Sequence, residues 1–288
     1  MRPDSLAQAV VDSFADTENP RLKHVLESLT RHLHDFVVDV NLSLEEWETA
    51  IDFLTRTGQK CDDVRQEFIL LSDVLGVSML VETLNDIETP EATDSTVLGP
   101  FHMIDSPRRA LGENISPDSS GQKCVVHGTI RDEQGVPVPS AVIDVWQADA
   151  EGFYDVQQPE SQQQGNGRGL FTADENGRFH FQSVVPSHYP IPTDGPVGEL
   201  LAATGRHAYR PAHIHFIVGA PGFRELTTHI FVEHSRYLGS DAVFAVKSSL
   251  VRDFTPRPAG TDNPCGLVEP FVEAQIDITL HDESGDDT

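Results

Sequence analysis

The tripeptide His213-Ile214-His215 is the sharpest chemical feature of the chain. Side chains two apart on a β-strand point to the same face, so both imidazoles can reach one metal ion. The same pattern also occurs on strands whose histidines form an ordinary polar face, and it is a weak metal signal by itself. The metal interpretation therefore depends on the other groups that accompany this pair.

Two tyrosines and an arginine are the groups that strengthen it. Tyr154 follows Glu151-Gly152-Phe153 at the end of a β-prone run, and Tyr189 lies in a proline-flanked loop. Arg210 leads directly into the histidine pair, where a cation suits an anionic or electron-rich ligand. The ordinary role of one tyrosine is a half-buried ring with its hydroxyl in water, and that of one arginine is a structural ion pair. The set is more informative than any member.

The elements that must position these residues fall into two halves with different periodicity. Residues 1 to about 90 are expected to be helical, because apolar residues recur at three- and four-residue steps over 22–36. Ser43 and Glu46 form a capping-box pair in front of a second apolar face. A third apolar stretch is expected to bend or break at Gly76.

From about residue 122 the hydrophobic period changes to two, which is typical of strands. Asn176-Gly177 predicts a hairpin, and Pro221-Gly222 separates two further strands. We therefore expect an α+β protein. Residues 1–100 form a helical domain and the start of a linker, and residues 101–288 form an antiparallel β-sandwich.

Composition limits the partners and the compartment. The chain has 46 acidic against 20 basic residues, and a net charge of -26 disfavours nucleic acid and anionic lipid surfaces as partners. Neither a membrane-spanning apolar run nor a secretory signal is evident. The three cysteines are odd in number and widely separated, which argues against a disulfide framework and favours the cytoplasm.

Five segments resemble intradiol dioxygenases in order and approximate spacing: WQADAEGFYD, RGLFTADENGRF, VVPSHYPIPTDGP, RPAHIHF and LTTHIFV. The resemblance is strong over about residues 90–255, and the helical part agrees with the dimerisation domain of that family. It implies a non-haem Fe(III) cofactor, with O2 as co-substrate. The iron ligands that it implies are Tyr154, Tyr189, His213 and His215. Phenolates are hard anionic donors that suit Fe(III), and the metal ionises them.

The same resemblance implies partners and a reaction. A homodimer is expected, and a phospholipid is a candidate partner because related proteins bury one between their helical parts. A catechol-type diol binds through both oxygens and displaces Tyr189, whose phenolate can accept a substrate proton, while Tyr154 stays bound. O2 attacks the activated ring, and the bond between the two hydroxyl-bearing carbons breaks to give a muconate-type dicarboxylate.

Two further residues receive catalytic roles from the resemblance. Arg210 matches the active-site arginine of the family, whose charge would stabilise the anionic ring and the developing oxyanion. His229 stands where catechol-cleaving members usually have glutamine, whereas hydroxyquinol-cleaving and some chlorocatechol-cleaving members have histidine. We expect His229 to orient a ligand or donate a hydrogen bond, with a third metal-binding histidine as the alternative.

Residues that match the pocket of hydroxyquinol 1,2-dioxygenases bear on the substrate. They are Leu70, Asp73, Val97, Leu98, Gly99, Pro100, Phe101, Ile191, Pro192 and Arg210. Asp73 can accept a hydrogen bond from a third ring hydroxyl, unless it is simply exposed on its helix. We expect hydroxyquinol (1,2,4-trihydroxybenzene) to be cleaved to maleylacetate/3-hydroxymuconate, with catechol or a chlorocatechol as the alternative substrate.

Two interpretations of another class remain open. The run VVHGTIRDEQGVPVPSAVIDVW also resembles transthyretin-type β-sandwich modules, which bind ligands without catalysis. A zinc hydrolase would account for the two histidines but not for the two tyrosines, and no CxxC pair supports a thiolate zinc site. Metal content separates these two interpretations from the dioxygenase: a dioxygenase predicts iron, a transthyretin-type module no metal, and a hydrolase zinc.

Overall fold

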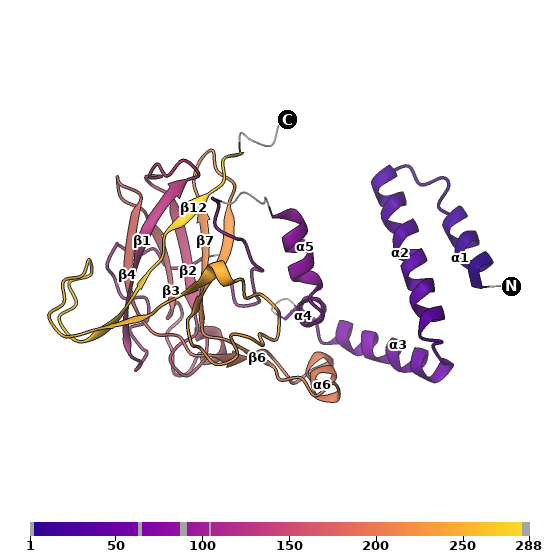
Figure 1. Ribbon diagram of the computed structural model, residues 1–288. Helices are drawn as coiled ribbons and strands as arrows, with labels where there is room; N and C mark the ends of the chain where they lie inside the picture. The colour runs from indigo at the N-terminus through magenta and orange to yellow at the C-terminus, as the bar shows by residue number, and fades with distance from the viewer. Residues whose placement is uncertain (1–2, 63–64, 87–90, 104, 284–288) are drawn as a thin grey trace. The chain divides into compact units, whose positions relative to one another are not determined.

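The computed structural model describes residues 3–62, 65–86, 91–103 and 105–283. It divides into two compact units, Met1–Gln59 and Lys60–Thr288. Helices make up the first unit, and strands dominate the second (Figure 1). The expected order of a helical N-terminal region and a β-sandwich is confirmed. Within the described ranges, no helix combines the length and apolarity needed to cross a bilayer.

The first unit consists of α1 (Pro3–Asp12), α2 (Pro20–Asp39) and α3 (Leu44–Gln59), and α1 and α2 lie side by side. Asn19 caps α2, since its side-chain oxygen accepts hydrogen bonds from two backbone amides of the first turn. The predicted capping box before α3 is present. The Ser43 amide donates to Glu46 Oε2 at 2.8 Å, and the Glu46 amide donates to Ser43 Oγ at 3.2 Å.

The second unit opens with two short helices, α4 (Glu67–Val74) and α5 (Val77–Asn85). Gly76 separates them with a φ of 74°, as the sequence predicts, because a left-handed residue ends one helix and lets the next begin. A further helix, α6 (Pro196–Ala203), contacts α4. Leu70 of α4 is buried in an apolar cluster that also contains Ile191 and Phe231.

Two five-stranded sheets form the sandwich. The first has the order β10-β11-β1-β12, with β4 also paired to β1, and the second has the order β3-β2-β7-β8-β9. Most pairs are antiparallel, but β1 pairs in parallel with β11 and β12, and β8 pairs in parallel with β9. The strands span Lys123–Asp132 (β1), Val142–Gln147 (β2), Arg168–Thr172 (β3), Arg178–Val184 (β4), Tyr189–Pro190 (β5), Tyr209–Arg210 (β6), His213–Gly219 (β7), Leu226–Val232 (β8), Val251–Arg252 (β9), Thr255–Arg257 (β10), Phe271–Gln275 (β11) and Ile278–Leu280 (β12).

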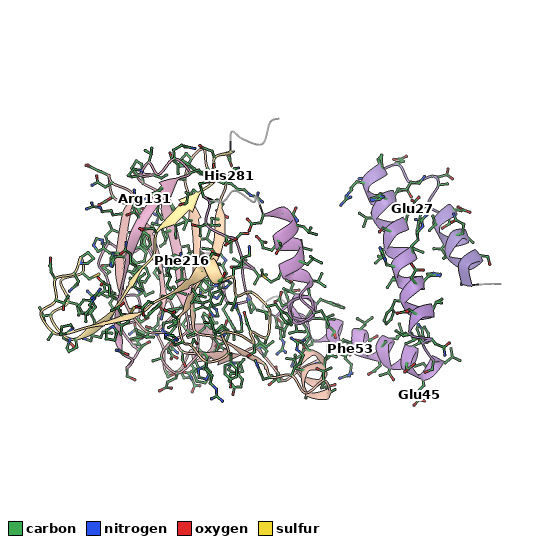
Figure 2. The ribbon with its side chains drawn as sticks, viewed as in Figure 1. Glu27, Glu45, Phe53, Arg131, Phe216 and His281 are labelled. Atoms are coloured by element: carbon green, nitrogen blue, oxygen red, sulfur yellow. The ribbon has the colours of Figure 1, made fainter. Side chains whose placement is uncertain are left out.

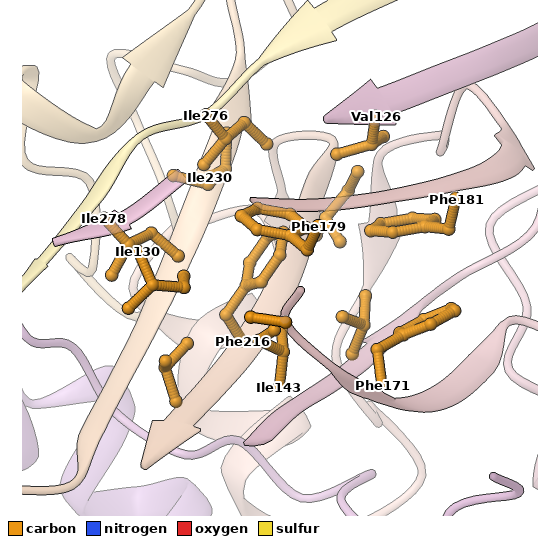
Figure 3. Packing of buried hydrophobic residues seen from close by; sticks show 14 of the residues in the cluster. Val126, Ile130, Ile143, Phe171, Phe179, Phe181, Phe216, Ile230, Ile276 and Ile278 are labelled. Carbon is orange, nitrogen blue, oxygen red and sulfur yellow. The ribbon is translucent and has the colours of Figure 1, made fainter. Parts of the chain in front are cut away.

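The main core lies between the two sheets. Aromatic and branched side chains from both sheets meet there, including Phe171, Phe179, Phe181, Phe216 and Ile230 (Figure 3). Phe171 and Phe181 stack with ring centroids 5.3 Å apart, although they belong to opposite sheets. Figure 2 shows Phe216 inside the sandwich. Side chains on a strand alternate between the two faces of its sheet, so the residues that point away from the core can form a functional site.

The predicted hairpin at Asn176-Gly177 is wrong. The turn exists, and Gly177 has a φ of 69°, but β3 before it pairs with β2, while β4 after it pairs with β1. The turn thus carries the chain from one sheet to the other. Its chemistry is local, with the Asp174 carboxylate accepting two backbone amides, whereas strand pairing is decided by which apolar faces meet in the core.

Candidate active site

The outer face of the second sheet carries the histidines. Along β7, Ile214 and Phe216 point into the main core, so His213 and His215 share the opposite face. Both imidazoles are buried, with 1% exposure. The structure therefore confirms that both histidines lie on one face of the strand. That face is buried, so they do not form a solvated polar face.

The neighbouring strands surround His215. β8 places His229 directly opposite it, and β2 places Trp146 on its other side. The Trp146 ring stacks on the His215 ring with centroids 4.5 Å apart and planes inclined by 11°. The His229 ring lies 4.1 Å from the His215 ring. His215 is thus clamped from both sides, which restricts the ring to one orientation.

Two separate segments outside the large sheets bring the tyrosines to this face. Tyr154 follows β2 and precedes a short 3-10 helix, Asp155–Gln157. Tyr189 belongs to β5, which pairs with β6 so that Tyr189 is opposite Arg210. Gly152 allows the two segments to approach, because it has a φ of 93° and an added Cβ would lie 2.8 Å from the His188 carbonyl oxygen.

The four side chains predicted as iron ligands converge on one point. His215 Nε2 lies 3.1 Å from Tyr154 Oη and 3.1 Å from His213 Nε2. Tyr189 Oη lies 3.3 Å from Tyr154 Oη and 3.5 Å from His213 Nε2. With bonds of about 2.1 Å to a shared ion, ligand atoms at right angles would be about 3 Å apart. The spacing of these four atoms therefore fits one central metal ion.

The histidines are arranged as neutral metal ligands. His213 Nδ1 lies 2.7 Å from the Pro211 carbonyl oxygen, which fixes the proton on Nδ1 and turns the Nε2 lone pair towards the other ligand atoms. Burial, reinforced by Arg210, lowers the pKa of His213 well below its usual range. Burial likewise lowers the pKa of His215. Two imidazole nitrogens only 3.1 Å apart and lacking positive charge favour a cation between them.

Burial has the opposite consequence for the tyrosine. It raises the pKa of the Tyr154 phenol well above its usual range, and the neighbouring Tyr189 adds to this effect. Without a strong positive charge at the centre, Tyr154 therefore stays a neutral phenol. A bound metal ion would reverse this, because coordination stabilises the phenolate and releases the proton.

Arg210 is oriented by a carboxylate. Arg210 Nε donates to Asp241 Oδ1 at 3.2 Å, and Nη2 lies 3.4 Å from Oδ2, while Nη1 lies 3.3 Å from His213 Nε2. Burial opposes the charge on Arg210, but Asp241 outweighs it and holds the pKa of Arg210 above its usual value. Asp241 thus holds Nε and Nη2 of the guanidinium, and Nη1 faces the proposed ligand atoms.

His229 has a different environment from His213 and His215. His229 Nδ1 hydrogen-bonds the hydroxyl of Thr96, and His229 Nε2 is buried without a partner among the described residues. Burial, with Arg210 next, lowers the pKa of His229. Ligand atoms of His213, His215 and His229 all lie within 4.8 Å of one another, so these three residues could also hold a metal ion. Because Nδ1 is engaged and Nε2 is free, His229 can either orient a neighbouring group or bind a metal ion through Nε2.

The residues predicted to line the substrate pocket occupy different positions. Leu70, Ile191 and Val97 belong to one apolar cluster. Phe101 stacks on Tyr154 with ring centroids 4.4 Å apart, and an added Cβ on Gly99 would lie 2.9 Å from His215 Cε1. The remaining predicted residues are Asp73, buried on α4, Pro192, which is half-buried, and Leu98 and Pro100, which are exposed.

Several functional contacts were not predicted from the sequence. Asp241, Trp146 and Thr96 each touch a group at the centre, but nothing in their local sequence links them to it. A buried carboxylate needs a partner, and only the folded chain shows that Arg210 is the partner of Asp241.

Comparison with known proteins identifies the family. The model described as "Dioxygenase" matches residues 101–281, and "Catechol dioxygenase N terminus" matches residues 19–93. The chain belongs to the intradiol ring-cleavage dioxygenases. It is 51% identical to 6-chlorohydroxyquinol 1,2-dioxygenase of Cupriavidus pinatubonensis, over 89% of this chain and 93% of that protein. It is 50% identical to hydroxyquinol 1,2-dioxygenase of Rhodococcus opacus, over 96% of this chain and 93% of that protein.

A solved structure agrees with this assignment. The crystal structure of hydroxyquinol 1,2-dioxygenase from Pseudomonas putida superimposes on this intradiol dioxygenase with a TM-score of 0.92, at 49% identity, covering 98% of this chain and 99% of that one. The matched residues cover both the helical part and the sandwich. The family resemblance drawn from five segments is therefore confirmed, and a non-catalytic transthyretin-type module is set aside.

Proposed function

We propose that this intradiol dioxygenase cleaves hydroxyquinol with O2 to maleylacetate/3-hydroxymuconate at a non-haem Fe(III) held by Tyr154, Tyr189, His213 and His215. The observation that carries the proposal is the convergence of two phenol oxygens and two imidazole nitrogens within 3.1 to 3.5 Å of their neighbours. Relatives about 50% identical are hydroxyquinol-type enzymes, which supports the substrate. Catechol or a chlorocatechol remains the alternative substrate.

The donor set favours ferric iron over zinc. Two anionic phenolates offset much of the ferric charge, and imidazole is a good ligand for iron. Bound Fe(III) would supply a Lewis acid that holds the diol as a dianion and makes its ring reactive towards O2. The rest of the chemistry depends on the chain's own residues. Among these, Tyr189 is the proposed base, since a phenolate released when the diol binds can take a substrate proton.

Arg210 and Asp73 are the proposed contacts to substrate. Arg210 presents Nη1 beside His213 Nε2, so its fixed charge would face negative charge that develops on the ring and its oxygens. Asp73 is 6% exposed and close enough to Arg210 for that charge to act on it. A carboxyl group in that position can hydrogen-bond a third ring hydroxyl, and it disfavours a substrate that lacks one.

The visible spectrum tests the proposed function directly. The purified protein should contain iron and show a broad tyrosinate-to-iron charge-transfer band. Anaerobic addition of hydroxyquinol should move the band to longer wavelength, because the oxygens of the bound diol would add charge transfer to iron of their own. A colourless protein that Fe(III) cannot reconstitute would reject the ferric site. A coloured protein that turns over catechol faster than hydroxyquinol would reject only the substrate.

Asp73→Ala is expected to separate the two substrates. Loss of a hydrogen bond to the third hydroxyl should lower kcat/KM for hydroxyquinol by about 10- to 100-fold. The change for catechol should be much smaller, because catechol has no hydroxyl at that position. Steady-state kinetics on both substrates make the measurement, with Glu82→Ala on α5 as the acidic-to-alanine control. Equal losses on both substrates would reduce Asp73 to a structural residue.

We also propose that residues 1–100 form a dimerisation domain and residues 101–288 the catalytic domain. In the single chain, apolar side chains of α2 stay unusually exposed, with Leu29 at 50%, Leu33 at 54% and Phe36 at 55%. A second copy would cover such a stripe, and a phospholipid would fill gaps along it. Light scattering should give the mass of a dimer, and organic extraction should release lipid. A monomer at working concentration would contradict the pairing.

The proposed compartment is the cytoplasm. None of the three cysteines forms a disulfide within the described residues, and Cys124 is fully buried in β1. Free thiols are the usual state in a reducing compartment. Fractionation of the source cells tests this, and recovery of the protein outside the cytoplasm would contradict it.

A further inference from the structure

A second buried arginine lies next to the site, and nothing proposed so far uses it. Arg168 opens β3, and its side chain and that of Asp155 are each only 1% exposed. Arg168 Nε and Nη2 donate to Asp155 Oδ1 at 2.8 and 2.7 Å. Asp155 Oδ2 accepts a hydrogen bond from the Gly165 backbone amide at 2.8 Å. This buried pair therefore joins β3 to the loop that follows β2.

The pair reaches Tyr154 by two routes. Asp155 is the next residue in the chain, so holding its carboxylate fixes the backbone on which Tyr154 stands. Arg168 Nη1 donates to the Phe101 carbonyl oxygen at 2.7 Å, and the Phe101 ring stacks on the Tyr154 ring with planes inclined by 23°. One ion pair thus holds a proposed iron ligand and the aromatic side chain that packs against it.

The energetics argue for positioning over stability. Removing two charges from water is costly, and apolar replacements of buried pairs are often neutral or stabilising. The planar fork of an arginine can bond a carboxylate and a carbonyl at fixed angles at the same time, whereas a lysine is a single point charge. Arg168 uses all three of its nitrogens in this way.

We propose that Arg168 and Asp155 are positioning residues whose buried ion pair sets the position of the Tyr154 phenolate and of the Phe101 ring packed against it. This inference rests on the proposed ferric site, because Tyr154 matters here as an iron ligand. The pair itself touches no reacting atom. Its effect on the reaction would pass through Tyr154, which would hold the iron, and through Phe101, which is expected to line the substrate pocket.

A neutral replacement of both members tests the proposal. Asp155→Asn combined with Arg168→Gln removes both charges together, so neither is left buried alone. The control is Arg257→Gln combined with Glu273→Gln, a more exposed ion pair between β10 and β11 of the other sheet. Iron affinity, the visible spectrum, kcat and KM are measured on both double variants. Circular dichroism establishes that each is folded.

The expected result is a change that a purely structural pair would not give. When Tyr154 and the Phe101 ring are no longer held in place, the charge-transfer band should shift, because its energy depends on the position of the phenolate oxygen relative to the iron. Iron affinity or kcat/KM should fall by about 10- to 100-fold, as is typical when a group behind a metal ligand is removed. The control pair should leave the band and kcat/KM unchanged. A folded Asp155→Asn/Arg168→Gln protein with the wild-type band, iron affinity and kinetics would overturn the proposal.

Arg168→Lys decides the matter if the double variant does not fold. Lysine keeps the charge but cannot hold Asp155 and the Phe101 carbonyl together. We therefore expect a shifted band and a reduced kcat/KM, and a wild-type band with wild-type kinetics would overturn the proposal. The two levels of inference fail differently. A wild-type protein without the band rejects the ferric site, whereas a coloured wild type with unaffected variants rejects only the role of the pair.

Discussion

His213→Ala and His215→Ala are each expected to abolish iron retention and activity. Each histidine supplies one of four convergent donor atoms, and His213 Nε2 and His215 Nε2 are 3.1 Å apart at the centre of the set. Losing a ligand should cost more than the 10- to 100-fold in metal affinity that is typical for removing a group behind one. Iron content after purification and the intensity of the visible band are the measurements.

His229→Gln is the matched control for this pair of variants. His229 is as buried as His215 and stands directly opposite it, it is not one of the four proposed ligands, and its Nδ1 hydrogen-bonds Thr96. Glutamine can keep a hydrogen bond to Thr96, so the variant should retain iron and its colour while turnover falls. Loss of iron in His229→Gln would instead assign the metal to the three-histidine cluster. Full iron occupancy in both alanine variants would reject the histidine ligands altogether.

How far the sequence predicts the site depends on the distance over which its parts interact. The positions of His213 and His215 on one face follow from strand periodicity alone, because the period of two is a property of any β-strand. The helix break at Gly76 and the capping box that begins α3 at Ser43 are equally local. Such features need only a few neighbouring residues, and the structure reproduces them.

Contacts between distant segments could not be predicted in this way. Tyr189 reaches the site because the two-residue strand β5 pairs with β6, and so short a strand leaves no periodic signal. Residues from both sheets decide the pairing of β3 and β4, so the Asn176-Gly177 signal alone predicts the wrong strand partners. Family resemblance, not periodicity, placed Tyr154 and Tyr189 beside the histidines.

Buried ion pairs were the least predictable part. Arg168 and Asp155 are 13 residues apart, and Arg210 and Asp241 are 31 apart. With 46 acidic residues in the chain, no pattern shows which carboxylate will be buried with which arginine. Only the packed structure, in which an unpaired buried charge is costly, selects the partners.

Arg210→Lys is expected to lower kcat by about 100- to 1,000-fold, the usual cost of losing a fixed group that stabilises developing negative charge. Lysine keeps a positive charge, so Asp241 is not left unpaired. It cannot hold Asp241 through one side of a planar fork while another nitrogen lies beside His213 Nε2. Iron content and the resting visible spectrum should stay close to wild type, because Arg210 is not one of the proposed ligands.

Arg206→Gln is the control, since Arg206 belongs to the same segment but donates to the Val74 and Ala242 carbonyl oxygens. That variant should lose some thermal stability and keep its kcat. Asp241→Asn should resemble Arg210→Lys in a weaker form, because the guanidinium remains but loses the carboxylate that aims it. An Arg210→Lys enzyme with wild-type kcat would show that the charge at this position, and not its direction, is what the reaction needs. Loss of iron in the same variant would instead place Arg210 among the groups that maintain the metal site.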